Sequence, residues 1–361
     1  RVLFRSMNLN INKNEPVMVT GATGFVASEL IKKLLENGIT VHAAVRNPED
    51  VSTLQHLTNL ESTLSGKIIF FKSDLLKEES YLKSMEGCSI VFHTASPFNF
   101  KVKDNQKGYI NPALEGTRNV LDSVNKTESV KRVVLTSSCA AIYGDAVDIS
   151  NYPNKTMTEE MWNSSSTSNY NAYSYSKTIA EKEAWEISKK QNNWKLVVIN
   201  PCFVLGPSIS KNPTSGTFEL LSQLADGSMK SGAAPFEIGA VDVKDVAEAH
   251  FKAAYLESAN GRNILYNKSL SMLDIANIIK DKFGDEWALP KKEAPKWLIW
   301  LIGPFVDKSL SRKMISNNFG HPWRADNSKS KKDLGIEYTP IERSIENMFQ
   351  QMIDNGIAKK R

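Results

Sequence analysis

The stretch Val17-Met18-Val19-Thr20-Gly21-Ala22-Thr23-Gly24-Phe25-Val26-Ala27 decides the fold of this chain of 361 residues. Its first three apolar residues predict a buried parallel strand that ends at Gly21. Leucine and isoleucine then recur at helical spacing over residues 30–35, and Asn37-Gly38 ends that helix. Residues 39–45 predict a second strand. The pattern is therefore a strand, a glycine-rich turn, a helix and a strand.

This turn has the chemistry of a phosphate site. Glycines let the backbone turn tightly and approach a pyrophosphate, while the helix N-terminus presents free N–H groups and the positive end of its dipole. The spacing Gly21-x-x-Gly24-x-x-Ala27 differs from the common Gly-x-Gly-x-x-Gly. An ordinary tight turn is the alternative interpretation, but the flanking strand and helix favour a dinucleotide site.

Composition and charge restrict the class of protein. Hydrophobic residues make up 41% and charged residues 24% of the chain, as in globular proteins. The net charge of +5 is spread along the chain, which argues against nucleic acid as a partner and agrees with a basic pocket for phosphates. Cys88, Cys139 and Cys202 lack metal-binding spacing, so we expect no metal site, no disulfide framework and a cytoplasmic location.

The length is compatible with one large α/β domain and an appended lobe. We expect a dinucleotide-binding domain over residues 7–205 and a mainly substrate-binding lobe over residues 206–361, of which residues 238–256 pack back on the first domain. Residues 1–6 precede a methionine and match no structural pattern. We interpret them as a non-native leader, with Met7 as the natural start.

The longest apolar run covers residues 297–306 and contains Gly303-Pro304. It is too short to span a bilayer, so we expect no transmembrane segment here. We interpret the run as a buried segment of the lobe or a substrate lid. The alternative is a surface patch that contacts a membrane or a lipid-like substrate.

Further strands are predicted over residues 67–71, 89–93, 131–135 and 196–199, with helical patterns between them. This alternation predicts a doubly wound parallel sheet, whose ligands bind at the carboxyl ends of the strands in a cleft against the smaller lobe.

Three groups of candidate ligand residues follow strands. Arg46 follows the second strand, where an acid would hold the ribose of NAD, and an arginine there favours the extra phosphate of NADP. Asp74 follows the third strand and could hydrogen-bond an adenine amino group or cap the next helix. Thr94, Ala95 and Ser96 follow the fourth strand, where small residues let the backbone pass close to a phosphate or ribose.

A helical pattern opens at Asn171, and its Tyr173 and Lys177 lie four residues apart on one face. With ten tyrosines in the chain, one such pair is expected by chance. The order of features is more informative than the spacing: a glycine turn, Ser138 after the fifth strand, then Tyr173 and Lys177 on a helix, then another apolar strand.

In this order of features the chain resembles the extended short-chain dehydrogenase/reductase family. Within that family it is most similar to the group of dihydroflavonol reductases, cinnamoyl-CoA reductases and methylglyoxal (3-methylbutanal) reductases, over residues 17–357. The matching segments are residues 21–27, 45–47, 93–98, 115–117, 135–138, 173–177, 200–201, 206–207 and 241–247.

The resemblance implies a carbonyl reductase that prefers NADP(H), with NAD(H) possible. Ser138, chosen over Ser137, would polarise the carbonyl, Tyr173 would donate the proton, and Lys177 would lower the pKa of Tyr173 and bind the nicotinamide ribose. The other implied cofactor contacts are Gly21, Thr23, Gly24, Phe25, Val26, Arg46, Asp74, Leu75, Thr94, Ala95, Ser96, Pro201 and Val204. The implied substrate contacts are Phe98, Cys139, Tyr143, Tyr170 and Phe203.

The leading hypothesis is therefore reduction of a small hydrophobic or aromatic aldehyde or ketone to the alcohol, by a monomer or a homodimer. One alternative is an NAD-dependent nucleotide-sugar epimerase or dehydratase, against which Arg46 argues. A second is a steroid-type hydroxy dehydrogenase. A third is a redox-sensing regulator without turnover, against which the Tyr173 and Lys177 pair argues. Relatives that prefer NADPH often carry a second basic residue soon after the arginine, whereas residues 48–52 contain none.

Overall fold

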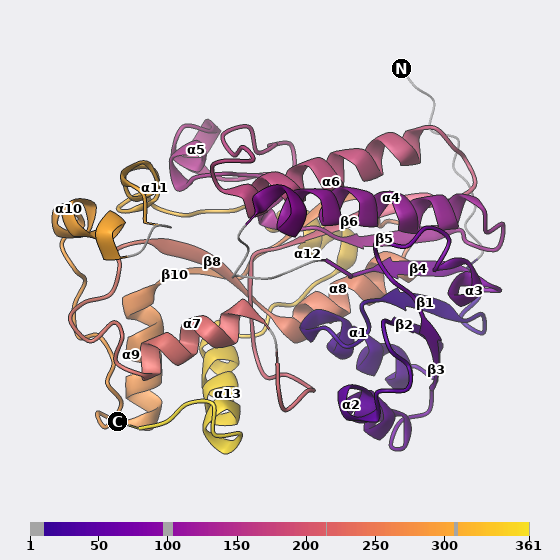
Figure 1. Ribbon diagram of the computed structural model, residues 1–361, viewed down its shortest axis with the longest axis horizontal. Coiled ribbons are helices and arrows are strands. Elements are labelled where there is room, and N and C mark those ends of the chain that lie inside the picture. The colour runs from indigo at the N-terminus through magenta and orange to yellow at the C-terminus, as the bar shows by residue number, and fades with distance from the viewer. Residues whose placement is uncertain (1–10, 97–103, 214, 307–309, 361) are drawn as a thin grey trace.

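The computed structural model describes residues 11–96, 104–213, 215–306 and 310–360. A parallel sheet of seven strands in the order β3-β2-β1-β4-β5-β6-β9 forms its centre, and helices cover both faces (Figure 1). This is the predicted doubly wound architecture, in which the strand order reverses beside β1. The strands are β1 (Val17–Thr20), β2 (Thr40–Val45), β3 (Lys67–Lys72), β4 (Ile90–His93), β5 (Arg132–Thr136), β6 (Lys195–Pro201) and β9 (Gly261–Leu265).

The predicted first strand lies inside this sheet, between β2 and β4. In β1, Val19 lies opposite Ala43 of β2 and Phe92 of β4, and all three residues are fully buried. Strands that are covered on both faces need apolar residues on both faces, which explains the uninterrupted run of valine and methionine in β1. The turn at Gly21 therefore opens at the carboxyl edge of the sheet, between the ends of β2 and β4.

Helices connect the strands of the main sheet. One of them begins at Asn111, after a π-helical turn, and Pro112 occupies its first turn, where a missing N–H is tolerated. The helices are α1 (Phe25–Glu36), α2 (Val51–Glu61), α3 (Leu82–Met85), the π-helical turn η1 (Gln106–Ile110), α4 (Asn111–Asn125), the 3-10 turn η2 (Cys139–Ala141), α5 (Ala146–Ser150), the 3-10 turn η3 (Pro153–Lys155) and α6 (Ala172–Lys189).

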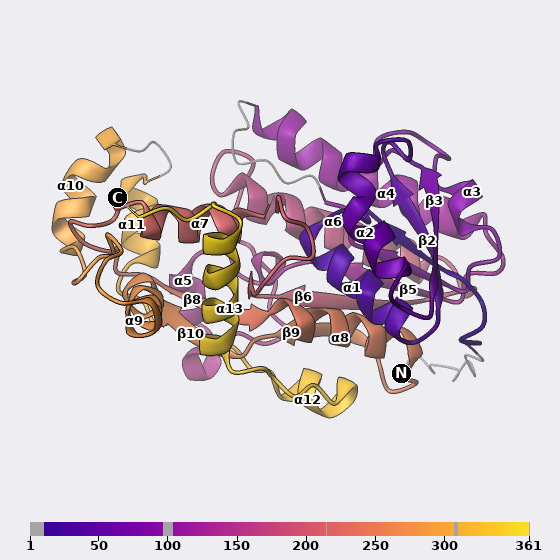
Figure 2. The same ribbon diagram turned by 90° about the horizontal axis from the view of Figure 1, so that it is seen from below.

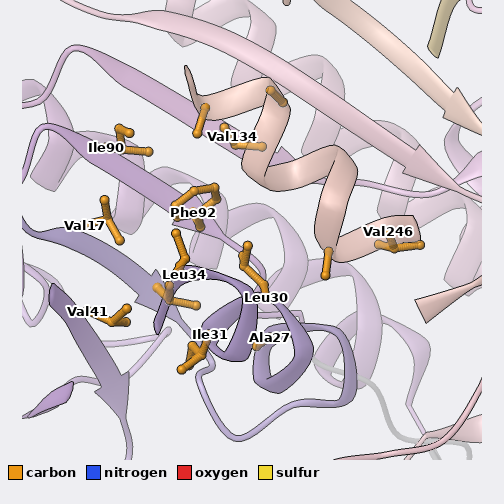
Figure 3. Packing of buried hydrophobic residues seen from close by; sticks show 14 of the residues in the cluster. Val17, Ala27, Leu30, Ile31, Leu34, Val41, Ile90, Phe92, Val134 and Val246 are labelled. Atoms are coloured by element: carbon orange, nitrogen blue, oxygen red, sulfur yellow. The ribbon is translucent and has the colours of Figure 1, made fainter. Parts of the chain in front are cut away.

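Two helices from distant parts of the sequence cover the same face of the sheet. In α1, the predicted stripe of Leu30, Ile31 and Leu34 is fully buried, and Figure 3 shows these side chains in the same buried cluster as Val246 of α8 (Val243–Tyr255). An ion pair of 2.6 Å between Lys33 Nζ and Glu248 Oε2 joins the two helices at their rim. The helix α8 comes after residue 205 in the chain, where residues of the smaller lobe were mainly expected, and yet it packs on the main sheet.

The smaller lobe is built around a mixed sheet of three strands, β7 (Phe203–Leu205), β8 (Glu237–Asp242) and β10 (Lys268–Ser271), in the order β10-β8-β7. Only Cys202 separates β6 of the main sheet from β7 of the lobe. Figure 2 shows a group of helices gathered around this sheet, away from β2 and β3. They are α7 (Gly216–Ala225), α9 (Met272–Phe283), α10 (Lys296–Val306), α11 (Arg312–Asn318) and α13 (Ile341–Asp354). The helix α12 (Ser328–Leu334) lies by α8 and β9 instead, and its Leu334 belongs to the core of the main sheet.

The expectation that residues 297–306 are a buried segment is wrong. They form most of α10, and within this helix only Gly303 is buried. Trp297 is 68% exposed and Phe305 is 84% exposed. Periodicity cannot show whether an apolar segment is covered by the rest of the chain. None of the helices in the ranges given above is long and apolar enough to cross a membrane.

The alternative that Asp74 caps a following helix is also wrong. The next helix, α3, begins only at Leu82, and turns occupy most of the intervening residues. The Asp74 carboxylate instead accepts a hydrogen bond from the backbone N–H of Leu76 at 2.9 Å, which is the local turn that aspartate favours.

Candidate active site

The turn after β1 strongly favours glycine at its first position. Gly21 has φ +61°, and a Cβ there would lie 3.0 Å from Ala95 Cα. Gly24 precedes the first turn of α1, which contains no acidic residue, and no side chain in the described part of the protein caps it. The backbone N–H groups of this helix end are therefore presented to an anion, so the residues present are compatible with the pyrophosphate of a dinucleotide.

Thr20 joins the ends of β1 and β4 beside this turn. Its hydroxyl accepts a hydrogen bond from the N–H of Ala95 at 2.9 Å and pairs with Nδ1 of His93 at 3.0 Å, while the Thr94 hydroxyl donates to its carbonyl. Burial, together with the nearby charge of Lys177, lowers the pKa of His93 to about 3, so this ring is neutral. These bonds place Ala95 against Gly21.

The predicted contacts to the adenosine half lie at the ends of β2 and β3. Arg46 is exposed directly after β2, next to the glycine turn in the sheet, because Ala44 pairs with Thr20. Asp74 is exposed and Leu75 is partly buried after β3. The Leu75 side chain fills the space above Gly116 of α4, where a larger residue would collide with it.

The start of α6 is fixed by Asn171. This residue adopts the left-handed conformation, with φ 55°, which asparagine tolerates better than most residues. Its side-chain amide donates to the carbonyl of Gly144 at 2.8 Å and accepts from the Ser174 hydroxyl at 2.9 Å. These contacts orient the first turn of α6, which carries Tyr173.

Ser138, Tyr173 and Lys177 lie together at the carboxyl edge of the sheet. The Ser138 hydroxyl is hydrogen-bonded to Tyr173 and also accepts from the N–H of Ala140 at 3.1 Å. Lys177 Nζ lies 5.8 Å from the centroid of the Tyr173 ring and donates to the Ser96 hydroxyl at 2.8 Å. The structure therefore brings residues of three segments into one group.

Burial dominates the titration of this group. It raises the pKa of Tyr173 above its ordinary value, an effect that Cys139 increases and the hydrogen bond to Ser138 opposes. The expected net lowering of this pKa by Lys177 is therefore not found. Burial also lowers the pKa of Lys177 to about 8, against the opposing charge of Glu181. Both shifts favour the neutral form, as desolvation requires.

The neighbouring serine has a different partner. Ser137 is buried, and its hydroxyl donates to Glu181 Oε2 at 2.5 Å. Its hydrogen is therefore engaged inside the protein, whereas Ser138 contacts Tyr173. This geometry supports the choice of Ser138 over Ser137.

Sequence reasoning missed the buried ion pair behind the site. Glu181, on α6 one turn after Lys177, pairs with Arg262 of β9 at 2.6 Å between Oε1 and Nε. Its other oxygen accepts from the Asn200 amide at 2.8 Å as well as from Ser137. The spacing of four residues from Lys177 could have pointed to Glu181. Nothing local could have pointed to Arg262.

The structure separates the residues that were predicted to line the substrate pocket. Cys139 and Tyr143 share a cluster with Trp323, and the rings of Tyr143 and Trp323 meet edge to face at 5.5 Å. Phe203 packs instead against the core of the lobe. The Tyr170 hydroxyl donates to the buried carboxylate of Asp145 at 2.8 Å. Phe98 lies outside the described residues.

Two aromatic residues near the site connect it to other elements. The ring of Tyr109, on η1, lies 6.2 Å from the Tyr173 ring, a contact that no sequence motif indicated. Phe25, at the start of α1, packs edge to face on Phe218 of α7 at 5.6 Å and so joins the glycine turn to the lobe. The remaining predicted contacts are Thr23 and Val26 at the glycine turn, Pro201 in β6 and Val204 in β7.

The sheet is doubly wound, a glycine turn follows its first strand, and serine, tyrosine and lysine meet at its carboxyl edge. This is the architecture of the extended short-chain dehydrogenases and reductases. The family model described as "NAD dependent epimerase/dehydratase family" matches residues 17–267, and the chain belongs to this family. It is an oxidoreductase of the reductase group within it.

Similar proteins include plant and fungal reductases. A cinnamoyl-CoA reductase of Medicago truncatula is 36% identical over 96% of this chain and 98% of its own length. A dihydroflavonol 4-reductase of Gerbera hybrida is 31% identical over 94% of this chain and 85% of its own. The structure of yeast methylglyoxal/isovaleraldehyde reductase Gre2 complexed with NADPH superposes with a TM-score of 0.73 at 26% identity, covering 95% of this chain and 100% of its own.

Proposed function

We propose that this protein transfers a hydride from NADPH to the carbonyl carbon of a small hydrophobic or aromatic aldehyde or ketone and releases the alcohol. The observation that carries this proposal is the contact between Ser138 and Tyr173, one helical turn from Lys177 and at the same sheet edge as the glycine turn. When bound, the nicotinamide supplies the hydride.

Tyr173 acts as the proton donor. Its raised pKa keeps the phenol protonated at neutral pH, which is the form a general acid needs. A proton from this phenol neutralises the alkoxide that develops as the carbonyl is reduced. Ser138 donates a second hydrogen bond to the same oxygen and stabilises its charge in the transition state.

Lys177 holds the positive charge of the site. With a pKa of about 8 it is protonated at neutral pH, and its contact with the Ser96 hydroxyl holds it at the end of β4. From this position the ammonium group binds the ribose of the nicotinamide half. Its charge favours proton loss from Tyr173 as the reaction proceeds.

Three features support NADPH as the preferred cofactor. Arg46 stands exposed after β2 and can make a charge-assisted contact with a 2′-phosphate. No acidic residue precedes Glu49 at this strand end. The similar reductases of yeast and Candida albicans were both solved with NADPH.

The class of substrate is inferred from the site and from relatives. Cys139 directly follows Ser138 in the chain, and both Cys139 and the aromatic Tyr143 belong to the cluster around Trp323. Such walls suit a hydrophobic carbonyl compound. The relatives' names refer to cinnamoyl-CoA, dihydroflavonol, and methylglyoxal or isovaleraldehyde.

Replacement of one tyrosine tests the mechanism. Tyr173→Phe should lower kcat by about 10²- to 10⁴-fold, because it removes the general acid, while NADPH binding stays nearly intact. Tyr175→Phe, on the same helix, serves as the matched control and should retain activity. Retained turnover in Tyr173→Phe would remove Tyr173 from the role of proton donor.

A substrate panel tests the reaction itself. Oxidation of NADPH and of NADH is followed by absorbance with methylglyoxal, isovaleraldehyde, an aromatic aldehyde, a hydrophobic diketone and a sterol ketone. Oxidation of NADPH by one of these compounds is the expected result. No oxidation of either cofactor, together with NAD bound tightly to the purified protein, would instead indicate the epimerase reaction.

A further inference from the structure

The helix α10 presents an apolar surface at the end of the lobe, far from β2 and β3 in both views (Figures 1 and 2). Six of its eleven residues are large, hydrophobic and between 39% and 84% exposed. Single exposed hydrophobic residues are ordinary, but a contiguous group of this kind marks an interaction site. The apolar surface consists of Trp297, Trp300, Leu301, Ile302, Phe305 and Val306.

This helix is anchored on its inner side. Gly303 faces the neighbouring helix, where an added Cβ would lie 3.3 Å from Cδ1 of Ile315. The Lys296 ammonium donates to the carbonyl of Phe319 at 2.6 Å, and the N–H of Ala294 bonds to the carbonyl of Ala233 at 2.8 Å. The helix is thus held in place while its outer side remains uncovered among the described residues.

Positive charge surrounds the apolar surface. Lys291 and Lys292 are exposed before α10, and Arg312 is exposed after it; these three residues form the basic rim. The guanidinium carbon of Arg312 lies 4.7 Å from the centroid of the Trp300 ring, which joins the basic rim to the apolar surface. The sequence from residue 291 to 313 contains six lysines or arginines and two acidic residues.

We propose that α10 and its basic rim bind the surface of a lipid bilayer that contains anionic lipids. Tryptophan and long cationic side chains are the residues that favour the boundary between headgroups and acyl chains. Each lysine or arginine near such a surface adds attraction to anionic headgroups. A second copy docked on this surface would instead bring two basic rims together.

The length of α10 fixes the mode of binding. Eleven residues of α-helix span about 16 Å, roughly half of the hydrocarbon core of a bilayer. The helix therefore lies in the interface with its apolar side chains among the headgroups and does not cross the membrane. The inner side, anchored through Gly303, stays on the protein.

Cosedimentation of the full chain with vesicles tests this proposal. One set of vesicles is pure phosphatidylcholine, and the other contains equal parts of phosphatidylcholine and phosphatidylserine. We expect binding to the mixed vesicles, weaker binding to the neutral ones, and a decrease as salt is added, because exposed charges are screened.

Exposed residues allow variants that leave the core intact. The double variant Trp297→Glu with Phe305→Glu should reduce binding to background. Val51→Glu with Ile69→Glu adds the same charge at exposed apolar positions of α2 and β3, and this matched control should bind the mixed vesicles.

A third variant tests the basic rim. Lys291→Gln with Lys292→Gln should lower the partition coefficient on mixed vesicles by about 30-fold, because each surface cation contributes about a factor of five. It should change binding to neutral vesicles little. Gel filtration of every variant shows whether α10 mediates self-association.

The outcomes separate the alternatives. Failure of the wild type to bind the mixed vesicles would overturn the proposal, as would equal binding by the Trp297 and Phe305 double variant. A dimer that this variant dissociates, without vesicle binding by the wild type, would assign the surface to a second copy. Reductase activity is measured without vesicles, so its presence or absence is independent of these results.

Discussion

Replacement of Glu181 by glutamine should destabilise the fold more than any other single loss of charge on α6. The carboxylate is buried and pairs with the buried guanidinium of Arg262 at 2.6 Å. It also accepts hydrogen bonds from Ser137 and Asn200. Glutamine keeps the shape of the side chain but removes its charge, and so leaves Arg262 as a buried cation without its anion.

The magnitude follows from this burial. Removal of one partner from a buried ion pair costs about 3–5 kcal/mol, because the remaining charge stays out of water. Arg262 keeps hydrogen bonds to the carbonyls of Glu159 and Met161, and its guanidinium lies 3.9 Å from the centroid of the Trp162 ring. These contacts place the expected loss near the lower limit, at about 3 kcal/mol.

The same helix offers a matched control. Glu183 pairs with Arg118 at 2.8 Å, but both side chains are partly exposed to solvent. Glu183→Gln should therefore lower the free energy of unfolding by at most about 1 kcal/mol. Urea unfolding of both variants at neutral pH measures the difference. If Glu181→Gln loses no more than Glu183→Gln, the reasoning from desolvation is wrong.

Three further predictions concern the site. Arg46→Asp should lower the ratio of kcat/KM for NADPH to kcat/KM for NADH by about 10- to 100-fold, because a hydrogen bond to a charged group contributes about 1.5–3 kcal/mol. An unchanged ratio would make Arg46 an ordinary surface charge. Gly21→Ala should lower the free energy of unfolding by about 1–3 kcal/mol, because residue 21 has a φ of +61° and an added Cβ would lie against the Ala95 backbone. A variant as stable in urea as the wild type would contradict this prediction. The value of kcat/KM should fall as pH rises through about 8, where Lys177 loses its proton. A flat pH profile in this range would mean that the charge of Lys177 does not control the rate.

Several features of the site depend on short segments and could be predicted from the sequence. The Gly21 turn needs only a strand before it and a helix after it, and both are visible as apolar periodicity. Tyr173 and Lys177 share a helix face because of helical geometry alone, whatever packs against the helix. The parallel arrangement of the six predicted strands follows from the alternation of strands and helices, since parallel neighbours need a crossover between them.

Other features depend on how distant segments meet, and only the tertiary structure decided them. The partners of the two adjacent serines depend on such meetings: Ser137 donates to the buried Glu181, whereas Ser138 contacts Tyr173. Arg262 pairs with Glu181 although the two residues are 81 positions apart in the chain. It lies in β9, the seventh strand of the sheet. The pKa of Tyr173 rises because surrounding segments exclude water, which a helix-face argument cannot include.

The helix α10 shows the same division most clearly. Its sequence determines that residues 297–306 are apolar and that the run is too short to span a bilayer. Whether such a helix is buried depends on whether another part of the chain covers it, and the described segments cover only the side at Gly303. Local propensity and spacing are encoded within a few turns, whereas burial and electrostatic environment belong to the complete set of neighbours in space.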